Sequence, residues 1–256
     1  MGKVISIFNQ KGGVGKTTTT INLSAGVGRM GKKILVVDID PQGNSTSGLG
    51  VEKNQVDFIA YDVLANDTPI KEAIHETSAE NVELIPANNE LAGLEIELAR
   101  ESGWETILKE KLELIKEDYD YVFIDCPPSL GILSIIGLVA SDSVIIPIQC
   151  EYYALEGVSQ LFETIRLVKK GLNPNLEIEG VVLSMFDGRT NLSIQVVDEV
   201  KSFFKGKVYT SIIPRNVRLA EAPSHGLSVL DYDLKSKGAE AYMELAEEFL
   251  ELAEEW

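Results

Sequence analysis

Cysteine is almost absent from this sequence, with only Cys126 and Cys150 among 256 residues. Two cysteines cannot form the disulfide framework that stabilises a small secreted domain. Histidine is as rare, at two residues, and the cysteines lack the C-x-x-C spacing that is typical of metal-binding motifs. The sequence is therefore not that of a disulfide-rich secreted protein.

Long apolar runs are also missing. No stretch reaches the roughly 18 apolar residues that would indicate a membrane-spanning helix, and the first residues lead directly into a strand pattern instead of a signal peptide. The hydrophobic fraction of 45% and the charged fraction of 25% are those of an ordinary globular protein. A length of 256 residues fits one α/β domain over residues 1–256. We expect a cytoplasmic protein with one substantial core.

Basic residues are outnumbered, since 23 Lys and Arg face 40 Asp and Glu and give a net charge of −17. This balance argues against binding to nucleic acid, which needs Lys and Arg at the phosphates. Net charge is a sum over the whole chain, however, and a basic patch can coexist with it. Any DNA binding would have to be local, shared across a dimer and strongly sensitive to salt.

A glycine-rich stretch, FNQKGGVGKTTTT over residues 8–20, is the most informative feature that the sequence does contain. It follows an apolar run at 4–8 that predicts a buried strand, and it leads into an expected helix at 21–27. Strand, glycine-rich turn and helix form the context of a phosphate-binding loop. Glycines let backbone N–H groups surround an anion, and the helix N-terminus adds its positive dipole end. Lys16 would supply charge to the β- and γ-phosphates of ATP, and the Thr17 hydroxyl would bind Mg²⁺.

The loop departs from the strict P-loop pattern at one position, because Gln10 stands where the first glycine should be. A second lysine, Lys11, follows it. The string resembles the deviant Walker A motif, K-G-G-x-G-K-[ST]-T, of the SIMIBI-class P-loop ATPases, although a chance glycine-rich turn is the other reading. In that class the first lysine reaches the phosphates in the facing subunit, so the resemblance implies a nucleotide-sandwich homodimer. The implied nucleotide contacts are Lys11, Gly12, Gly13, Val14, Gly15, Lys16, Thr17 and Thr18, with both lysines in catalytic roles.

Two aspartates, Asp38 and Asp40, follow the apolar run of a second expected strand at 34–38. They would point the same way if the strand continued, and strand ends beside a P-loop handle Mg²⁺ and the attacking water. Either residue could instead form a turn before Pro41. The string D-x-D-P-Q-G-N resembles the switch I segment of the ParA/MinD group. That resemblance implies that Asp40 orients the attacking water beside the metal.

A third aspartate, Asp125, ends the apolar strand pattern YVFID at 121–125. The pattern is typical of a Walker B motif, in which the aspartate holds Mg²⁺ through water. The Cys-Pro-Pro-Ser that follows resembles the entry to switch II of the same group. The alternative is that Asp125 caps a helix over 130–139.

The remaining pattern alternates between strands and helices. This alternation predicts an α/β P-loop NTPase fold, with a doubly wound, mostly parallel sheet flanked by helices. Further strands are expected at 83–86, 143–148, 178–185 and 208–213, and further helices at 59–64, 70–75, 91–101, 104–115, 154–171, 193–204 and 237–256.

Two strings narrow the resemblance to the ParA/Soj branch, namely R-T-N-L at 189–192 and I-P-R-N-V-R-L-x-E-A-P-S-H-G at 213–226. The resemblance implies that Pro214 and Asn216 hold the adenine and that Arg189 and Arg218 lie on a face that binds DNA without sequence preference. The alternative for either arginine is a solvated surface charge. The branch also implies slow ATP hydrolysis stimulated by a ParB-type partner, in the cytoplasm and at the nucleoid.

Two relatives of this branch suggest other functions. A MinD-like ATPase would carry a basic amphipathic C-terminal helix for anionic membranes, whereas residues 237–256 are acidic and would be repelled by such a surface. Leu245, Phe249 and Leu252 in that helix form an apolar stripe expected to pack on the sheet. An iron–sulfur protein like the nitrogenase iron protein would need cysteines that bridge two subunits; Cys126 follows the Walker B aspartate, but Cys150 has no such context.

Overall fold

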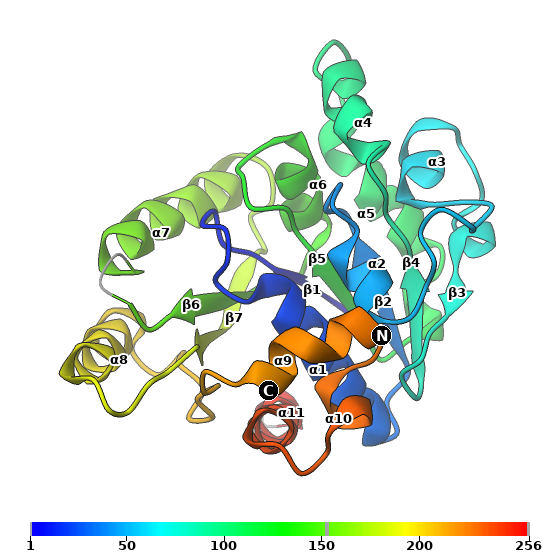
Figure 1. Ribbon diagram of the computed structural model, residues 1–256. Helices are drawn as coiled ribbons and strands as arrows, with labels where there is room; N and C mark the ends of the chain where they lie inside the picture. Colours follow the sequence, from blue (N-terminus) through cyan, green and yellow to red (C-terminus); the bar gives the residue numbers. More distant parts are fainter. Residues whose placement is uncertain (1, 152–153, 255–256) are drawn as a thin grey trace.

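The computed structural model describes residues 2–151 and 154–254. Its strands form one sheet in the order β3-β4-β2-β5-β1-β6-β7 (Figure 1). All neighbouring strands are parallel except β3, which is antiparallel to β4. The bounds are β1 (Lys3–Ile7), β2 (Ile34–Asp38), β3 (His75–Glu76), β4 (Val82–Ile85), β5 (Tyr121–Asp125), β6 (Ser143–Gln149) and β7 (Glu177–Ser184).

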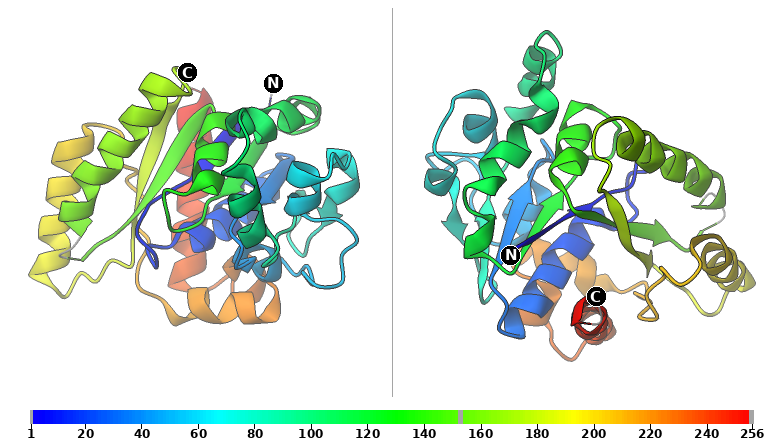
Figure 2. Two further views of the ribbon diagram at one scale, coloured as in Figure 1. Left: turned by 90° about the horizontal axis from the view of Figure 1, so that it is seen from above. Right: turned by 180° about the vertical axis from the view of Figure 1, so that it is seen from behind.

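Helices cover both faces of this sheet, with α1 and α11 on one face and α5, α6 and α7 on the other (Figures 1 and 2). The α-helices are α1 (Lys16–Arg29), α2 (Asn44–Gly48), α3 (Ala60–Ala65), α4 (Leu91–Leu98), α5 (Ile107–Glu113), α6 (Ile132–Ala140), α7 (Ala154–Gly171), α8 (Asn191–Phe204), α9 (Val217–Glu221), α10 (Val229–Tyr232) and α11 (Lys237–Glu254). Shorter 3₁₀ turns are η1 (Ile70–Ala73), η2 (Trp104–Thr106), η3 (Lys116–Asp118) and η4 (Ala222–His225).

The central strands are mostly apolar because both of their faces are buried. In β2, Ile34 and Val36 pack into the core beneath α1 and α11, while Leu35 and Val37 pack into the core on the opposite face. Successive side chains of a strand point to opposite faces, so a sheet with helices on both sides needs apolar residues at every position. The predicted α/β fold is confirmed.

The C-terminal helix α11 holds α1 in place. Gly26 of α1 lets the two helices approach, since a Cβ there would lie 2.8 Å from the Cβ of Ala246. The buried hydroxyls of Thr19 and Tyr242 are 3.2 Å apart. Phe249 packs edge-on against Tyr121 of β5 at 5.0 Å. The start of α1, where the glycine-rich loop ends, is therefore fixed to the core.

The apolar stripe predicted in α11 is right for two of its three members. Leu245 and Phe249 are buried, but Leu252 is 40% exposed. The last two residues of the predicted helix 237–256 lie outside the described residues.

The strand predicted at 208–213 is wrong. This segment runs beside β7 but forms only one isolated bridge with it, Val181 with Val208, and a second bridge, Phe186 with Pro214, lies just beyond both segments. The N–H groups of Thr210 and Ser211 donate instead to the carboxylate of Glu248 in α11, at 2.6 and 2.9 Å. The contact with α11 interrupts the ladder, and the segment becomes an irregular edge of the sheet.

The helix predicted at 70–75 is also wrong at its end. The chain forms the short turn η1 and then the strand β3, in which His75 pairs with Leu84. The helix predicted at 104–115 divides into η2 and α5, and the helix predicted at 91–101 ends at Leu98. Pairing with β4 overrides the local helical spacing at His75.

Candidate nucleotide-binding site

The glycine-rich loop joins β1 to α1 at the carboxyl edge of the sheet. Gly13 and Gly15 have φ values of 73° and 94°, in the left-handed region that other residues rarely adopt. A Cβ on Gly13 would meet nothing within 4 Å, so backbone conformation and not crowding requires glycine there. The loop therefore curls over open space, and α1 begins at Lys16 with its N-terminus facing that space.

Two side chains tie the loop to the neighbouring strands. Asn9 accepts from the N–H of Lys11 at 3.0 Å and donates to the carbonyl of Pro147 in β6 at 2.8 Å. On the other side, Ser184 at the end of β7 donates to the carbonyl of Val14 at 2.7 Å. The loop is thus preorganised by β6 and β7. No local pattern in the sequence indicated Ser184.

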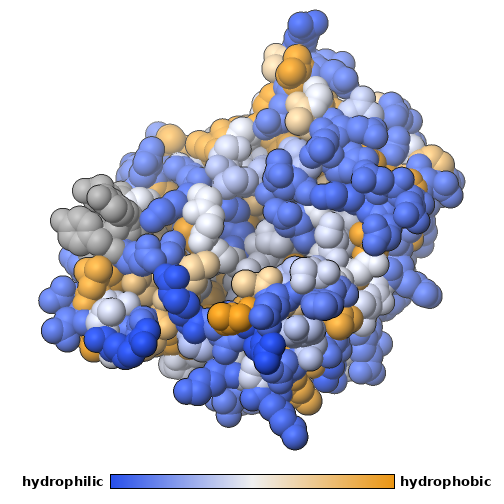
Figure 3. Space-filling view, in the orientation of Figure 1, coloured by the Kyte–Doolittle hydropathy of each residue, from blue (hydrophilic) through white to orange (hydrophobic). Residues whose placement is uncertain are grey.

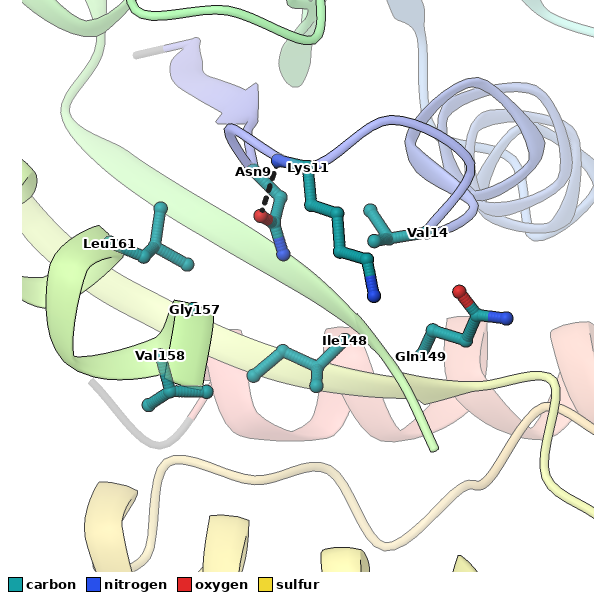
Figure 4. A pocket seen from close by; sticks show the side chains of 8 residues that line it. All are labelled: Asn9, Lys11, Val14, Ile148, Gln149, Gly157, Val158 and Leu161. Carbon is teal, nitrogen blue, oxygen red and sulfur yellow. Dashed lines mark hydrogen bonds between the residues drawn. The ribbon is translucent and has the colours of Figure 1, made fainter. Parts of the chain in front are cut away.

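The two lysines of the loop lie in different environments. Lys16 is 6% exposed, and its Nζ donates to the carbonyl of Lys11 at 3.2 Å. Burial lowers the pKa of Lys16 below its ordinary value, although the charges of Asp125 and Asp40 oppose this shift. Lys11 is exposed, and its side chain extends past Val14 toward Gln149 (Figure 4). Lys16 faces the inside of the loop, and Lys11 lies at its surface.

Asp125 lies at the end of β5, directly beneath the start of α1. Its Oδ2 accepts from the Thr17 hydroxyl at 2.8 Å and from the Ser45 hydroxyl at 2.7 Å, and its Oδ1 accepts from Thr20 at 3.3 Å. Asp125 does not cap a helix, because α6 begins after Gly131. The structure brings Thr17 and Asp125 together as expected, and it adds Ser45, which directly follows the switch I string.

Asp38 and Asp40 have different partners. Asp38 is fully buried and accepts from the N–H and the hydroxyl of Thr46, at 2.9 and 2.8 Å, so it anchors α2. Asp40 is 7% exposed and accepts from the N–H of Gln42 at 2.9 Å, which is the turn-forming role considered as an alternative. Asp40 also lies near enough to raise the pKa of both Lys16 and Asp125. It therefore shapes a turn and faces the site.

Asp38 and Asp125 are opposite each other in the register of β2 and β5, which concentrates negative charge at the strand ends. Burial raises the pKa of Asp125 to about 6, although hydrogen bonds from Ser45 and Thr17 act in the other direction. Burial and the charge of Asp125 raise the pKa of Asp38 to about 8. Two buried carboxylates with raised pKa values favour a cation nearby.

The oxygen ligands at this position fit Mg²⁺. The described residues contain no cluster of three or more His, Cys, Asp or Glu that could hold a metal by themselves. Mg²⁺ in nucleotide sites is usually held by one or two protein oxygens, with water and phosphate completing the shell. The Thr17 hydroxyl and the Asp125 carboxylate, 2.8 Å apart, provide such a pair.

Replacing Asp125 by asparagine is expected to stabilise the nucleotide-free protein at pH 8. The pKa of Asp125 in the folded protein, about 6, exceeds its ordinary value of 3.8, so the folded state binds the proton more tightly and stability falls as pH rises through that window. Asparagine removes this penalty, by on the order of 1–3 kcal/mol at pH 8 and nothing near pH 4. Urea unfolding across pH measures the difference.

Asp187→Asn is a control of opposite sign. Hydrogen bonds from Arg189 lower the pKa of Asp187 to about 2. Replacing this carboxylate by an amide should therefore not stabilise the protein at any pH. A wild type and Asp125→Asn with the same pH dependence of unfolding would contradict the assignment of a buried, charged Asp125.

A cavity of about 230 Å³ opens beside the loop, between Thr18 of α1, the end of β7 and α9. The predicted residues Pro214 and Asn216 both line it. Asn216 also caps α9 by accepting from the N–H of Arg218 at 2.8 Å. The size and the mostly apolar walls of the cavity suit a planar ring. The lining residues that were not assigned to the nucleotide from the sequence are Ser184, Met185, Ile213, Arg215, Leu219, Ala220 and Tyr242.

Arg189 lies in the loop from β7 to α8, and Arg218 lies in α9, just after the loop that follows α8. The two loops are joined where the N–H of Arg215 donates to the carbonyl of Phe186 at 3.1 Å. Arg189, with 88% of its side chain exposed, pairs with Asp187 at 2.6 Å. Arg218 pairs with Glu221 at 2.7 Å. Hydrophilic residues cover most of this face of the molecule (Figure 3).

The structure bears on the iron–sulfur alternative. Cys126 and Cys150 are both buried, at 0% and 1% exposure, so neither lies at a surface where a second subunit could share a cluster with it. Over residues 2–151 and 154–254, no helix has the length and apolar character to cross a membrane.

Comparison with known proteins places the chain in a family. A family model described as an AAA domain matches residues 2–178. The sporulation initiation inhibitor protein Soj of Bacillus subtilis is 59% identical over 248 residues, covering 97% of this chain and 98% of that protein. The chromosome partitioning protein ParA of Myxococcus xanthus is 51% identical over 250 residues, covering 98% and 88%. Among solved structures, cobyrinic acid a,c-diamide synthase from Mycobacterium smegmatis with bound ATP analogue and magnesium superposes with a TM-score of 0.87 at 37% identity, covering 99% of this chain and 96% of that one. The chain belongs to the ParA/Soj family of chromosome-partitioning ATPases.

Proposed function

We propose that this protein is an ATP-dependent molecular switch that acts in chromosome or plasmid segregation. It binds ATP and Mg²⁺, closes as a homodimer, binds DNA without sequence preference and releases the DNA on hydrolysis. One observation carries the proposal: Lys16, Thr17 and Asp125 meet under a glycine loop, with a ring-sized cavity beside them. Membership of a family of partitioning ATPases supports the same reading.

The nucleotide would lie across the start of α1. Pro214 and Asn216 hold the base in the cavity, and the backbone N–H groups from Gly12 to Thr18 face the phosphates. Lys16, buried inside the loop, places its ammonium against the β- and γ-phosphates. Thr17 and Asp125 would hold Mg²⁺, which supplies neutralisation of the phosphate charge.

Hydrolysis requires a water held in line with the γ-phosphate. Asp40 is the residue assigned to this role, since it lies close enough to Lys16 and Asp125 to raise the pKa of both. Its hydrogen bond from Gln42 fixes its orientation. Catalysis then consists of positioning and charge stabilisation. An enzyme that relies only on positioning and charge stabilisation would hydrolyse ATP slowly, and a partner protein would stimulate it.

The second lysine supplies the link between subunits. The carbonyl of Lys11 accepts a hydrogen bond from Lys16 of the same chain, while the side chain of Lys11 is exposed. In the homodimer, Lys11 of each subunit reaches the phosphates bound by the other. The bound ATP then links the two subunits, whose facing surfaces carry acidic residues.

DNA binding would use Arg189, in the loop before α8, and Arg218, in α9. Each arginine is paired with a carboxylate in the same chain, so DNA phosphates must compete with Asp187 and Glu221. One subunit alone would bind DNA weakly, and a dimer presents both arginines twice.

A ParB-type partner with a basic segment would suit the acidic surface of a chain with net charge −17. The acidic α11 disfavours anionic membranes, so we place the protein in the cytoplasm at the nucleoid.

The dimer is tested by light scattering with a non-hydrolysable ATP analogue and Mg²⁺. We expect the wild type to shift from monomer to dimer, and Lys11→Ala to bind the nucleotide but stay monomeric. Lys109→Ala, an exposed lysine of α5, is the matched control and should dimerise normally. A wild type that remains monomeric, or a Lys11→Ala variant that dimerises equally well, would refute the sandwich.

A further inference from the structure

A second cavity, of about 340 Å³, lies between α7, the start of β7 and the end of α8. The two helices run side by side along the outer edge of the molecule (Figure 2). The apolar walls of this cavity are Phe162, Ile165, Leu176, Ile178, Phe203 and Phe204. Nothing in the nucleotide mechanism uses these residues.

The mouth of the cavity exposes two aromatic rings. Phe162 is 38% exposed and Phe203 is 45% exposed, and their rings meet edge to face at 5.6 Å. Phe203 packs in turn against Phe204 at 5.0 Å. Neighbouring aromatic rings that stay exposed around a hollow are typical of a site where another side chain inserts.

The rim of this cavity is basic, in contrast to the rest of the chain. Arg166, Lys169, Lys205 and Lys207 line it, and Glu177 is the one acidic residue among the lining residues. The whole chain has a net charge of −17. Arg166 pairs with Glu163 and Lys169 with Glu177, but cations still outnumber these carboxylates around the hollow, and this local excess attracts anionic ligands.

The cavity lies at the edge of the sheet opposite to the nucleotide site. Glu177 and Ile178 begin β7, whereas Ser184 ends it beside the glycine loop. The distance along an eight-residue strand separates the two sites. A partner could occupy the cavity whether or not nucleotide closes the opposite edge.

We propose that this cavity binds an acidic segment of a partner protein that inserts an aromatic or large aliphatic side chain between α7 and α8. Charge complementarity selects an acidic peptide, and the exposed rings provide the contact for its apolar residue. A stacked DNA duplex offers phosphates but no side chain that could fill the hollow. Glu177 forms an ion pair with Lys169. A carboxylate of the partner would replace Glu177 in this ion pair.

The test is fluorescence anisotropy with a fluorescein-labelled acidic peptide that carries a pair of phenylalanines, at low ionic strength. We expect the wild type to bind it equally with and without an ATP analogue. Lys205→Glu should weaken binding by about tenfold, and so should Phe203→Ser, since each removes one half of the recognition. Lys109→Glu, which makes the same charge change on α5, should bind as the wild type does.

Glu177→Gln gives a result that misfolding cannot produce. Removing the competing carboxylate should tighten binding of the peptide by about two- to fivefold, because surface ion pairs are weak. The proposal is overturned if the wild type does not bind, if a peptide with alanines in place of the phenylalanines binds as tightly, or if duplex DNA of equal charge displaces the peptide. Because the measurement needs neither hydrolysis nor dimers, its failure would leave the proposed ATP switch unaffected.

Discussion

Replacing Lys16 by alanine is expected to lower ATP hydrolysis by at least about 100-fold, the usual effect of losing one charge-stabilising group in a preorganised site. Lys16 is the one cation of the loop that the fold buries, and its Nζ is held by the carbonyl of Lys11 within the loop. The side chain of Lys11 lies at the surface of the loop and cannot replace it within the same subunit. Phosphate release from the purified variant with ATP and Mg²⁺ measures the effect.

Stability separates a catalytic loss from a folding defect in this variant. Burial lowers the pKa of Lys16, so the folded protein gains nothing by holding its ammonium there without nucleotide. We therefore expect Lys16→Ala to unfold in urea at the same concentration as the wild type or at a higher one. Hydrolysis within tenfold of the wild-type rate, in a folded variant, would show that the buried lysine is not the phosphate-binding group.

The second large effect is expected from Asp40→Ala, which should reduce hydrolysis by about 10²- to 10⁴-fold, the range for a group that handles a proton or orients water. Unlike Lys16, Asp40 is not placed to hold the nucleotide, because its carboxylate accepts a hydrogen bond from Gln42 at the entry to α2. ATP binding should survive, and the ATP-bound dimer should accumulate. A nucleotide-binding assay and size measurement on the same sample test both points.

The neighbouring aspartate provides the contrast for this variant. Asp38 anchors α2 through two hydrogen bonds from Thr46, so Asp38→Ala should mainly lower the free energy of unfolding and loosen the segment that carries Ser45. If Asp40→Ala hydrolysed ATP at the wild-type rate, the attacking water would have to be oriented by another residue. If it failed to bind ATP, Asp40 would belong to the binding contacts instead.

Motif spacing was enough to predict the parts of this site that lie on consecutive residues. The loop needs glycine at positions 13 and 15 because the backbone is left-handed there, and glycines at these positions can be read directly from the sequence. Asp125 could be expected beside Thr17 from motif order alone, because strand ends of a parallel sheet meet at one edge. Those two inferences rest on local rules.

The parts that could not be predicted depend on contacts between distant segments. Ser184 supports the loop from 170 positions away, and Tyr242 enters the base cavity from the last helix. The strand expected at 208–213 fails because Glu248 takes two of its N–H groups. Hydrophobic periodicity reports which face of an element is buried but not which partner covers it, so these contacts have no local signal.

The measurement that tests the central claim most directly is co-sedimentation with random-sequence duplex DNA, in ATP, ADP and no nucleotide, at increasing salt. We expect the wild type to bind DNA only with ATP and Mg²⁺, Asp40→Ala to retain it longer, and Arg189→Glu and Arg218→Glu to weaken it. Binding should fall steeply with salt because the contacts are to phosphates. No DNA binding by the wild type, or binding that is the same in all three nucleotide states, would contradict an ATP-gated DNA switch while leaving the fold and the nucleotide site intact.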